Sequence, residues 1–327
     1  MLKIGIIGVG YLGNFHLKNL LTHKNITVPG FFDIDENRSA FIAADYRVKS
    51  FASRAELLQA CDAVFVVVPT KSHYEVTQEA LENGLHVFCE KPVTEKIEQA
   101  ERLMKIAAQK GLVLQVGHIE RFNPAFKALE HCQLYPKFIE CHRISMFNER
   151  GIKSAVIPEL MIHDLDILLT IVNSKITDIQ ASGTPVLTDN VDIANVRINF
   201  ENGCVANVTA SRISDKVVRK FRIFQENAYI NIDFLEKKTE FFAMEPLDKN
   251  YYLIKNFDLP GHNKKTIYYK CIEGKEVNAM VEEQKNFIDA VTKNQPPLVT
   301  GEDGLAALKL AHRIEAVIQK NLSKLEF

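Results

Sequence analysis

The stretch LKIGIIGVGYLG at residues 2–13 joins a short apolar run directly to a glycine-rich turn. Residues 2–7 have the pattern of a strand, and the residues after the turn have the pattern of a helix. Glycines at such a turn let backbone N–H groups approach a phosphate, whose charge the helix N-terminus favours. The stretch therefore predicts a Rossmann-type domain that binds a dinucleotide. The residues expected at its pyrophosphate are Gly8, Gly10, Tyr11, Leu12 and Gly13.

Further apolar runs alternate with amphipathic stretches over the first third of the chain. They cover residues 27–32, 63–68, 86–89 and 112–116. The run at 63–68, AVFVVV, is apolar on both faces, as a parallel strand between two helix layers requires. The alternation predicts a doubly wound α/β sheet, and we place this first domain at residues 1–120.

Residues 121–327 have longer strand patterns of alternating polarity and fewer helices. Asn202 and Gly203 predict a two-residue hairpin turn between two of these strands. We expect an α+β domain for substrate binding and oligomerisation, built on a large, mainly antiparallel open sheet. Its free face is a candidate surface for a homodimer or homotetramer, although exposed apolar side chains are also common on monomers. Helical patterns at 279–292 and 302–319 are candidates to pack back on the first domain.

The composition argues against several classes of protein. A formal net charge of −1 gives no broad attraction to nucleic acid or to anionic lipid. Six cysteines without Cys-x-x-Cys spacing predict reduced thiols rather than disulfides or a zinc site. No apolar run approaches the ~20 residues that span a bilayer, and no signal-peptide pattern is present. We expect a cytoplasmic protein with no metal, no nucleic-acid partner and no membrane anchor.

Asp33 ends the second strand pattern, about 20 residues after the glycine-rich turn. A carboxylate there can accept hydrogen bonds from the adenosine ribose, and it repels the 2′-phosphate of NADP. Ile34 supplies neither a charge nor a donor that would offset this repulsion. Arg38 is close enough in sequence to reach a phosphate, but it falls in a helix pattern and we expect it on the solvent face. The sequence favours NAD over NADP.

Two further turns follow strand patterns at the expected cofactor edge. Pro69 and Thr70 follow the run at 63–68, and His73 comes just after them. In open α/β sheets ligands bind beyond the carboxyl ends of the strands, so we expect all three residues to contact the cofactor. A proline turn followed by an ordinary helix start is the alternative interpretation.

Glu90 and Lys91 follow the run at 86–89, and we expect both at the cofactor. Pro92 restricts Lys91 to an extended backbone and raises the chance of a cis bond. At the end of a parallel strand, the lysine can reach the reacting end of the cofactor. A surface lysine before a loop proline is the alternative.

Residues 157–166, IPELMIHDLD, predict a helix in the second domain. Proline suits its first turn. Glu159, His163 and Asp166 fall on one side, roughly opposite an apolar stripe. A carboxylate four residues before a histidine can orient the imidazole and raise its basicity. Glu159 and His163 are therefore candidate catalytic residues. A structural or surface histidine is the alternative. The stripe consists of Met161, Leu165, Leu168 and Val172.

These motifs together resemble the glucose–fructose oxidoreductase / inositol dehydrogenase / MocA (Gfo/Idh/MocA) family over essentially the whole chain. The family's Glu-Lys-Pro motif stands at residues 90–92, and its His-Asp pattern stands at 163–164. The resemblance implies NAD(P)-dependent oxidation of a secondary hydroxyl of a sugar or polyol. It also implies that Lys91 contacts the reacting hydroxyl and that His163 is the general base. The family commonly has aspartate where this chain has Glu159.

Residues 117–124, GHIERFNP, also resemble the branch of this family that oxidises UDP-N-acetylglucosamine at C3. In that interpretation Arg121 pairs with the diphosphate, and Asn123 joins Lys91 and His163 at the substrate. Arginine before phenylalanine is widespread in the family, so a structural role for Arg121 is the alternative. Two other functions stay open for the chain. One is a non-catalytic sensor of nucleotide and sugar, and the other is a reductase of the biliverdin-reductase type.

Overall fold

The computed structural model describes residues 1–130, 132–148, 154–245, 252–257, 265–274 and 276–324. The chain forms two compact units. The first contains residues 1–122 and 278–309, and the second contains residues 123–277 and those from 310 onward. Residues 278–309, which the sequence pattern grouped with the second half of the chain, thus fold with the first unit.

The first unit is built on a six-stranded parallel sheet in the order β2-β1-β4-β5-β6, with β3 also paired to β1. Its strands are β1 (Leu2–Ile7), β2 (Ile26–Thr27), β3 (Phe31–Phe32), β4 (Ala63–Val66), β5 (His86–Glu90) and β6 (Leu114–Gly117). Its helices are α1 (Tyr11–Leu20), α2 (Glu36–Tyr46), α3 (Arg54–Gln59), α4 (His73–Glu82), α5 (Ile97–Lys110), α8 (Ala279–Lys293), the first part of α9 (Gly301–Leu322) and the short turns η1 (Thr70–Ser72) and η2 (Ile119–Phe122).

Alternate residues of β4 are buried on opposite faces of this sheet. Val64 and Val66 pack in an apolar cluster with residues of α3, α4 and α5. Phe65 packs in a second cluster with residues of α1, α2 and α8, which contributes Phe287. Helices thus cover both faces, as a parallel sheet requires, and the predicted doubly wound fold is confirmed.

The apolar run at 27–32 does not form one strand, as the sequence predicts, but divides into β2 and β3. Pro29 and Gly30 separate the two pieces. A Cβ atom on Gly30 would lie 2.3 Å from the main-chain oxygen of Lys49, so the close approach of the two backbones requires glycine there. Proline also removes one backbone donor from the strand.

The second unit is built on a nine-stranded sheet in the order β14-β15-β13-β12-β11-β7-β10-β9-β8. All its strand pairs are antiparallel except β7 with β10, so the predicted mainly antiparallel open sheet is confirmed. The strands are β7 (Phe138–Met146), β8 (Ile176–Thr184), β9 (Ile193–Phe200), β10 (Val205–Ser214), β11 (Val218–Gln225), β12 (Ala228–Asp233), β13 (Lys238–Ala243), β14 (Tyr252–Phe257) and β15 (Lys265–Glu273).

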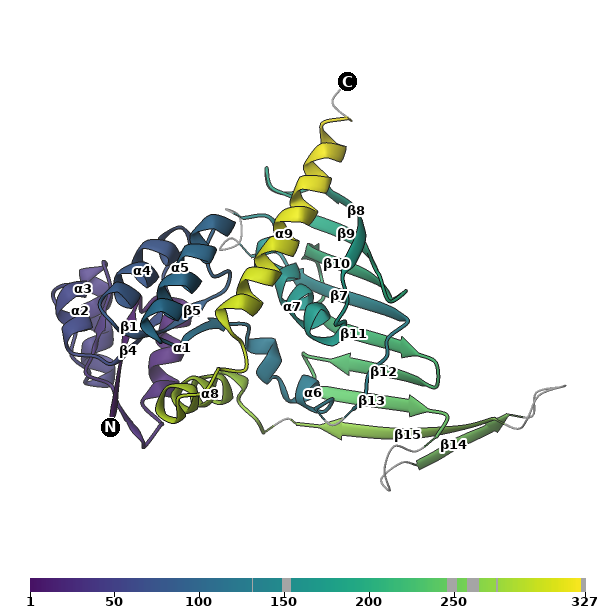
Figure 1. Ribbon diagram of the computed structural model, residues 1–327, viewed down its shortest axis with the longest axis horizontal. Coiled ribbons are helices and arrows are strands. Elements are labelled where there is room, and N and C mark those ends of the chain that lie inside the picture. Colours follow the sequence, from purple (N-terminus) through teal and green to yellow (C-terminus); the bar gives the residue numbers. More distant parts are fainter. Residues whose placement is uncertain (131, 149–153, 246–251, 258–264, 275, 325–327) are drawn as a thin grey trace. The chain divides into compact units, whose positions relative to one another are not determined.

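Helices cover one face of this sheet. They are α6 (Pro124–Lys127), the π-helical turn η4 (Ile157–Met161), α7 (Ile162–Ile171) and the second part of α9. Figure 1 shows α6, α7 and this part of α9 on the same side of the strands. Leu165, Ile198 and Ile314 belong to the buried apolar cluster between the helices and the strands. The opposite face carries no helix among the described residues.

The hairpin between β9 and β10 differs from the predicted two-residue turn. The N–H of Phe200 donates to the main-chain oxygen of Cys204 at 2.9 Å, so three residues connect the strands. Gly203 has a φ of 82°, the left-handed conformation that such three-residue loops place at their last position. The predicted glycine is therefore correct, and the predicted loop length is wrong.

Phe65→Ala should destabilise the first unit strongly, because Phe65 is fully buried and its ring is stacked 4.4 Å from that of Phe88. We expect a loss of about 3–5 kcal/mol in the free energy of unfolding, measured by urea denaturation with circular dichroism. Phe41→Ala is the matched control, since Phe41 is 69% exposed, and it should change stability by less than about 0.5 kcal/mol. Equal effects of the two substitutions would contradict this core.

Candidate active site

The glycine-rich turn between β1 and α1 has the close contacts that a pyrophosphate site needs. Gly8 has a φ of 91°, and a Cβ atom there would lie 2.4 Å from the main-chain oxygen of Val67. A Cβ atom on Gly13 would lie 2.0 Å from the main-chain oxygen of Gly8. At Gly10, by contrast, no atom lies within 4 Å of the Cβ position. The turn is thus tight on the protein side and open where a phosphate would approach.

Helix α1 begins after Gly10 with neither a side-chain cap nor an acidic residue in its first turn. Phosphate oxygens can therefore take the place of the cap at these N–H groups. Tyr11 and Leu12, which start the helix, are 66% and 38% exposed. The residues present at this turn fit a dinucleotide.

Asp33 lies beside the same turn. Its Oδ2 accepts the N–H of Val9 at 2.8 Å, and its Oδ1 accepts the N–H of Asp35 at 2.9 Å. The guanidinium of Arg38 lies 3.5 Å from Asp33 and 3.3 Å from Asp35. The side chain of Arg38 is 45% exposed, as expected, but its guanidinium also contacts the Asp33 carboxylate. The repulsion that Asp33 exerts on a 2′-phosphate is therefore reduced.

Glu90, at the end of β5, is a buried carboxylate that fixes the backbone of Lys91. Its Oε2 accepts the N–H of Lys91 at 3.2 Å, and its Oε1 lies 2.9 Å from His16 Nε2. A Cβ atom on Gly117 would lie 3.0 Å from the carboxyl group, so any larger residue on the neighbouring strand would have to displace this group. Burial by itself raises the pKa of Glu90, but the hydrogen bond from His16 and the charge of Lys91 lower it overall.

Hydrogen bonds determine the tautomer of His16. The Nε2 amide of Gln284 donates to the main-chain oxygen of His16 at 3.1 Å and lies 3.2 Å from His16 Nδ1. Because this amide nitrogen is a donor, Nδ1 must accept, and the proton of the ring sits on Nε2. His16 therefore donates to Glu90, which remains an acceptor at both oxygens.

Glu283, next to Gln284 on α8, is a buried acid that the sequence patterns did not reveal. It is fully buried, and its carboxyl oxygens have no hydrogen-bond partner among the described residues. Burial, and then the charge of Glu90, raise its pKa well above the usual range. Glu283 is therefore held as the neutral acid behind Glu90. A single acidic residue in a helical pattern carries no sequence signal for such burial.

His73, the first residue of α4, has its ring buried between two main-chain oxygens. The side chain is 1% exposed. Its Nδ1 lies 2.7 Å from the main-chain oxygen of Pro92, and its Nε2 lies 2.9 Å from that of Val68. These contacts join two loops, and the expected contact of His73 with the cofactor stays a prediction. Pro69 is exposed and Thr70 is half-buried at the end of β4, where a ligand can reach them.

In the second unit, Glu159 and His163 belong to two different kinds of helix. Glu159 belongs to the π-helical turn η4, and His163 is the second residue of α7. The prediction of one continuous α-helix is therefore wrong at this point, although the predicted apolar stripe is buried. Glu159 and His163 are half-buried, whereas Asp166 is 1% exposed and does not share their more exposed environment. Turns of π-helix are frequent at functional sites.

Two buried arginines fix the backbone around this histidine. Arg143 forms a bidentate ion pair with Asp164, at 2.8 and 3.0 Å, directly after His163. Arg212 lies 3.6 Å from Glu159 Oε2 and 3.4 Å from Asp192 Oδ1. Both arginines are almost fully buried, so each needs its carboxylate partners.

Asp192 in turn closes a loop beside Arg212. Its carboxylate accepts the N–H groups of Val186, Leu187 and Thr188 at 2.7 to 2.9 Å. Burial raises the pKa of this carboxyl, but these hydrogen bonds outweigh it and lower the pKa to about 2. Arg212 and Asp192 were not identified from the sequence, because their partners lie far from them along the chain.

Arg121 and Asn123 have structural partners. Arg121 is 7% exposed, and its guanidinium lies 3.3 Å from Asp303 at the start of α9. Asn123 accepts the N–H of Ala125 at 3.0 Å and caps α6, while its amide donates to the main-chain oxygen of Phe234 at 3.0 Å. These contacts favour the structural role that was the alternative for Arg121, and they occupy both ends of the Asn123 amide.

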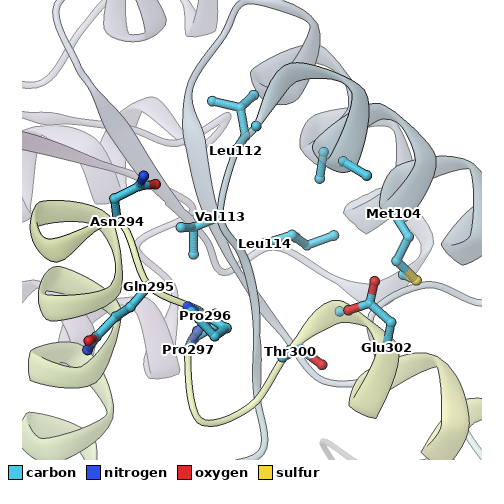
Figure 2. A pocket seen from close by; sticks show the side chains of 14 residues that line it. Met104, Leu112, Val113, Leu114, Asn294, Gln295, Pro296, Pro297, Thr300 and Glu302 are labelled. Atoms are coloured by element: carbon cyan, nitrogen blue, oxygen red, sulfur yellow. The ribbon is translucent and has the colours of Figure 1, made fainter.

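A separate cavity of about 290 Å³ lies at the start of β6 (Figure 2). Met104 of α5, Leu114 of β6, and Pro296, Thr300 and Glu302 from the chain around the start of α9 line it. The cavity lies at the amino end of a parallel strand, whereas the glycine-rich turn lies at the carboxyl ends of the strands. It is therefore outside the expected cofactor site.

Neither a metal centre nor a membrane span is found in the described part of the chain. No group of three or more histidine, cysteine, aspartate or glutamate residues there could hold a metal ion. None of its helices combines the length and the apolar character needed to cross a bilayer.

Residues 2–118 match the model of an oxidoreductase family with an NAD-binding Rossmann fold, and residues 134–231 match the GFO/IDH/MocA C-terminal domain. The chain is 32% identical to UDP-N-acetylglucosamine 3-dehydrogenase from Acidithiobacillus ferrooxidans, over 98% of this chain and 99% of the relative. It is 24% identical to myo-inositol 2-dehydrogenase from Thermotoga maritima, over 99% of both.

Solved structures are also similar to this chain over nearly its whole length. A structure of the Acidithiobacillus enzyme superposes with a TM-score of 0.88 at 31% identity and covers 98% of both chains. Scyllo-inositol dehydrogenase from Lactobacillus casei, solved with NAD(H) and scyllo-inositol, has a TM-score of 0.78 at 21% identity and covers 98% of both chains. The second likeness shows a shared fold.

Gly10→Ala should weaken NAD binding without destabilising the protein. The added methyl group meets no atom within 4 Å, so we expect an unchanged melting temperature. It occupies the side from which the pyrophosphate approaches, so the Kd for NAD should rise about tenfold or more in calorimetry. Gly13→Ala should in contrast also lower the melting temperature. Unchanged NAD affinity in Gly10→Ala would contradict the assigned site.

Proposed function

Because this chain belongs to the GFO/IDH/MocA oxidoreductase family, we propose that it oxidises the C3 hydroxyl of UDP-N-acetylglucosamine with NAD. The observation that carries the proposal is the end-to-end match, at 32% identity, to a relative with this activity. The inositol dehydrogenase that also matches end to end is less similar. The family assignment makes the chain an NAD-binding enzyme that acts on hydroxyl groups, and the particular hydroxyl is our inference.

The proposal does not depend on Arg121. The sequence offered this arginine as a ligand of the diphosphate, but its burial and its ion pair with Asp303 favour a structural role. Lys91 and His163 are half-buried, which leaves part of each side chain accessible to a ligand.

In the proposed reaction, the family resemblance assigns Lys91 to the reacting hydroxyl and His163 to its proton. NAD, when bound, accepts the hydride of the carbinol carbon at C4 of its nicotinamide. The ammonium of Lys91 stabilises the developing negative charge on oxygen, and His163 removes the proton, which leaves a ketone. Exchange of the acid and base roles between the two residues gives the same products.

We favour NAD over NADP because Asp33 lies beside the glycine-rich turn with its carboxylate held by the N–H groups of Val9 and Asp35. Arg38 lowers the strength of this preference, since its guanidinium reaches the same carboxylate. We also infer a cytoplasmic enzyme, because all six cysteines are free thiols.

Purified protein mixed with NAD and UDP-N-acetylglucosamine should produce reduced nicotinamide, followed by its absorbance. Lys91→Ala and His163→Ala should each lower kcat by about 10²- to 10⁴-fold while the Kd for NAD changes little. The matched controls are Lys105→Ala and His312→Ala, on α5 and α9, which should keep kcat.

Three outcomes separate the alternatives. Reduction with inositols or free hexoses but not with UDP-N-acetylglucosamine would overturn the substrate and keep the reaction class. Binding of the nucleotide sugar with no reduction would favour a sensor. Full activity in either alanine variant would contradict the assigned catalytic residues.

We further propose that the helix-free face of the nine-stranded sheet joins copies of this chain into a homodimer or homotetramer. Five aromatic rings follow one another across neighbouring strands on this face, with centroids 4.8 to 5.6 Å apart. They are half-buried, and they alternate with side chains that face the helices. A continuous apolar stripe of this kind is typical of an interface. The rings are Phe138, Phe224, Tyr229, Phe242 and Tyr269.

Phe224→Glu should dissociate such an oligomer, because it places an unpaired charge between two other rings of the stripe, Phe138 and Tyr229. Light scattering after size exclusion should give a smaller mass for this variant than for the wild type. Phe41→Glu, on exposed α2, is the control and should keep the wild-type mass. An unchanged oligomer in Phe224→Glu would place the interface elsewhere.

A further inference from the structure

Each ring nitrogen of His73 lies within hydrogen-bond distance of a main-chain carbonyl oxygen. Nδ1 lies 2.7 Å from the main-chain oxygen of Pro92, and Nε2 lies 2.9 Å from that of Val68. A carbonyl oxygen cannot donate, and a neutral imidazole carries only one N–H. With one proton, the ring would hold an unprotonated nitrogen against a carbonyl oxygen at hydrogen-bond distance. Both contacts are satisfied only when both nitrogens carry protons.

The environment of His73 supports a charge in spite of burial. Burial by itself lowers the pKa, but the neighbouring Cys89 and the two carbonyl oxygens raise it, to about 9 overall. Cys89, from β5, is the titratable group that acts on the ring, and its own sulfur is fully buried against the main-chain oxygen of Val93. A ring with protons on both nitrogens is an imidazolium, and the raised pKa favours this form at neutral pH.

The two carbonyl groups belong to the two loops at the expected cofactor edge. Val68 lies between β4 and the Pro69-Thr70 turn, and Pro92 directly follows Lys91. On the other side of Lys91, its N–H donates to the Glu90 carboxylate. The backbone of Lys91 is thus fixed before the residue by a buried carboxylate and after it by His73.

We propose that His73 is a buried imidazolium that positions Lys91 by holding the carbonyl group of Pro92 to the loop of Val68. His73 does not touch the reacting atoms and acts only through its neighbours. The effect on turnover rests on the proposed function of Lys91, whereas the charge state of the ring does not.

The charge state can be measured without substrate. In the intact, NAD-free protein with ¹⁵N-labelled histidine, NMR should show His73 with both ring nitrogens protonated at neutral pH. The signal should titrate near pH 9. A His73 ring with one proton at neutral pH would overturn the proposal, whatever the activity of the enzyme.

The charge state of His73 can also be tested through the pH dependence of stability, which runs opposite to that of a carboxylate with a lowered pKa. A pKa raised from 6.5 to about 9 in the folded protein stabilises fully below 6.5, and the contribution disappears as pH rises through 9. The difference in melting temperature between wild type and His73→Asn should therefore shrink from pH 6.5 to pH 9. A difference that is constant over this range would count against a charged ring.

Two neutral variants separate the two contacts. The amide nitrogen of asparagine can replace Nδ1 and keep the bond to Pro92, whereas that of glutamine can replace Nε2 and keep the bond to Val68. We expect His73→Asn to keep kcat within a few-fold and His73→Gln to lose about tenfold or more, with similar Kd for NAD in both. His86→Asn, at the other end of β5, is the matched control and should keep kcat. Equal kcat in the two His73 variants would overturn the positioning role.

Discussion

Hydrogen bonding of a buried charge at the carboxyl end of β5 is the constraint on which the rest of the candidate site depends. A charge removed from water is tolerated only with fixed partners, and those partners define where its neighbours lie. Glu90 is held by His16 and by the N–H of Lys91, and Gly117 leaves room for its carboxyl group. The glycine-rich turn follows β1, at the same carboxyl end of this parallel sheet. The fold that binds the dinucleotide therefore also fixes the backbone of the lysine.

The second unit applies the same principle around a different residue. Arg143 pairs with Asp164, next to His163, and Arg212 contacts both Glu159 and Asp192. The longer side chain of glutamate, where the family commonly has aspartate, thus reaches a buried arginine on a neighbouring strand. Each unit therefore holds one proposed catalytic side chain in a half-buried position, on a backbone anchored by buried ion pairs or hydrogen bonds.

Local patterns were enough to predict the doubly wound sheet, the open antiparallel sheet and the glycine-rich turn, because strand periodicity and positive-φ glycines are local properties. They could not reveal the buried acid Glu283 or the partners of Arg212, which are set by contacts between distant segments. The π-helical turn at Glu159 also escaped prediction, since helical periodicity assumes 3.6 residues per turn throughout. Arg121 matched a motif with two interpretations, and its burial beside Asp303 favours the structural one.

Transfer of a hydride from C3 of a nucleotide sugar to NAD by this chain can be followed with an isotope. The protein should be incubated with NAD and UDP-N-acetylglucosamine deuterated at C3, and the reduced cofactor analysed by mass spectrometry and NMR. If the proposed hydride transfer occurs, we expect one deuterium at C4 of the nicotinamide and a ketone at C3 of the sugar. Reduced cofactor without deuterium, or no reduced cofactor at all, would contradict it.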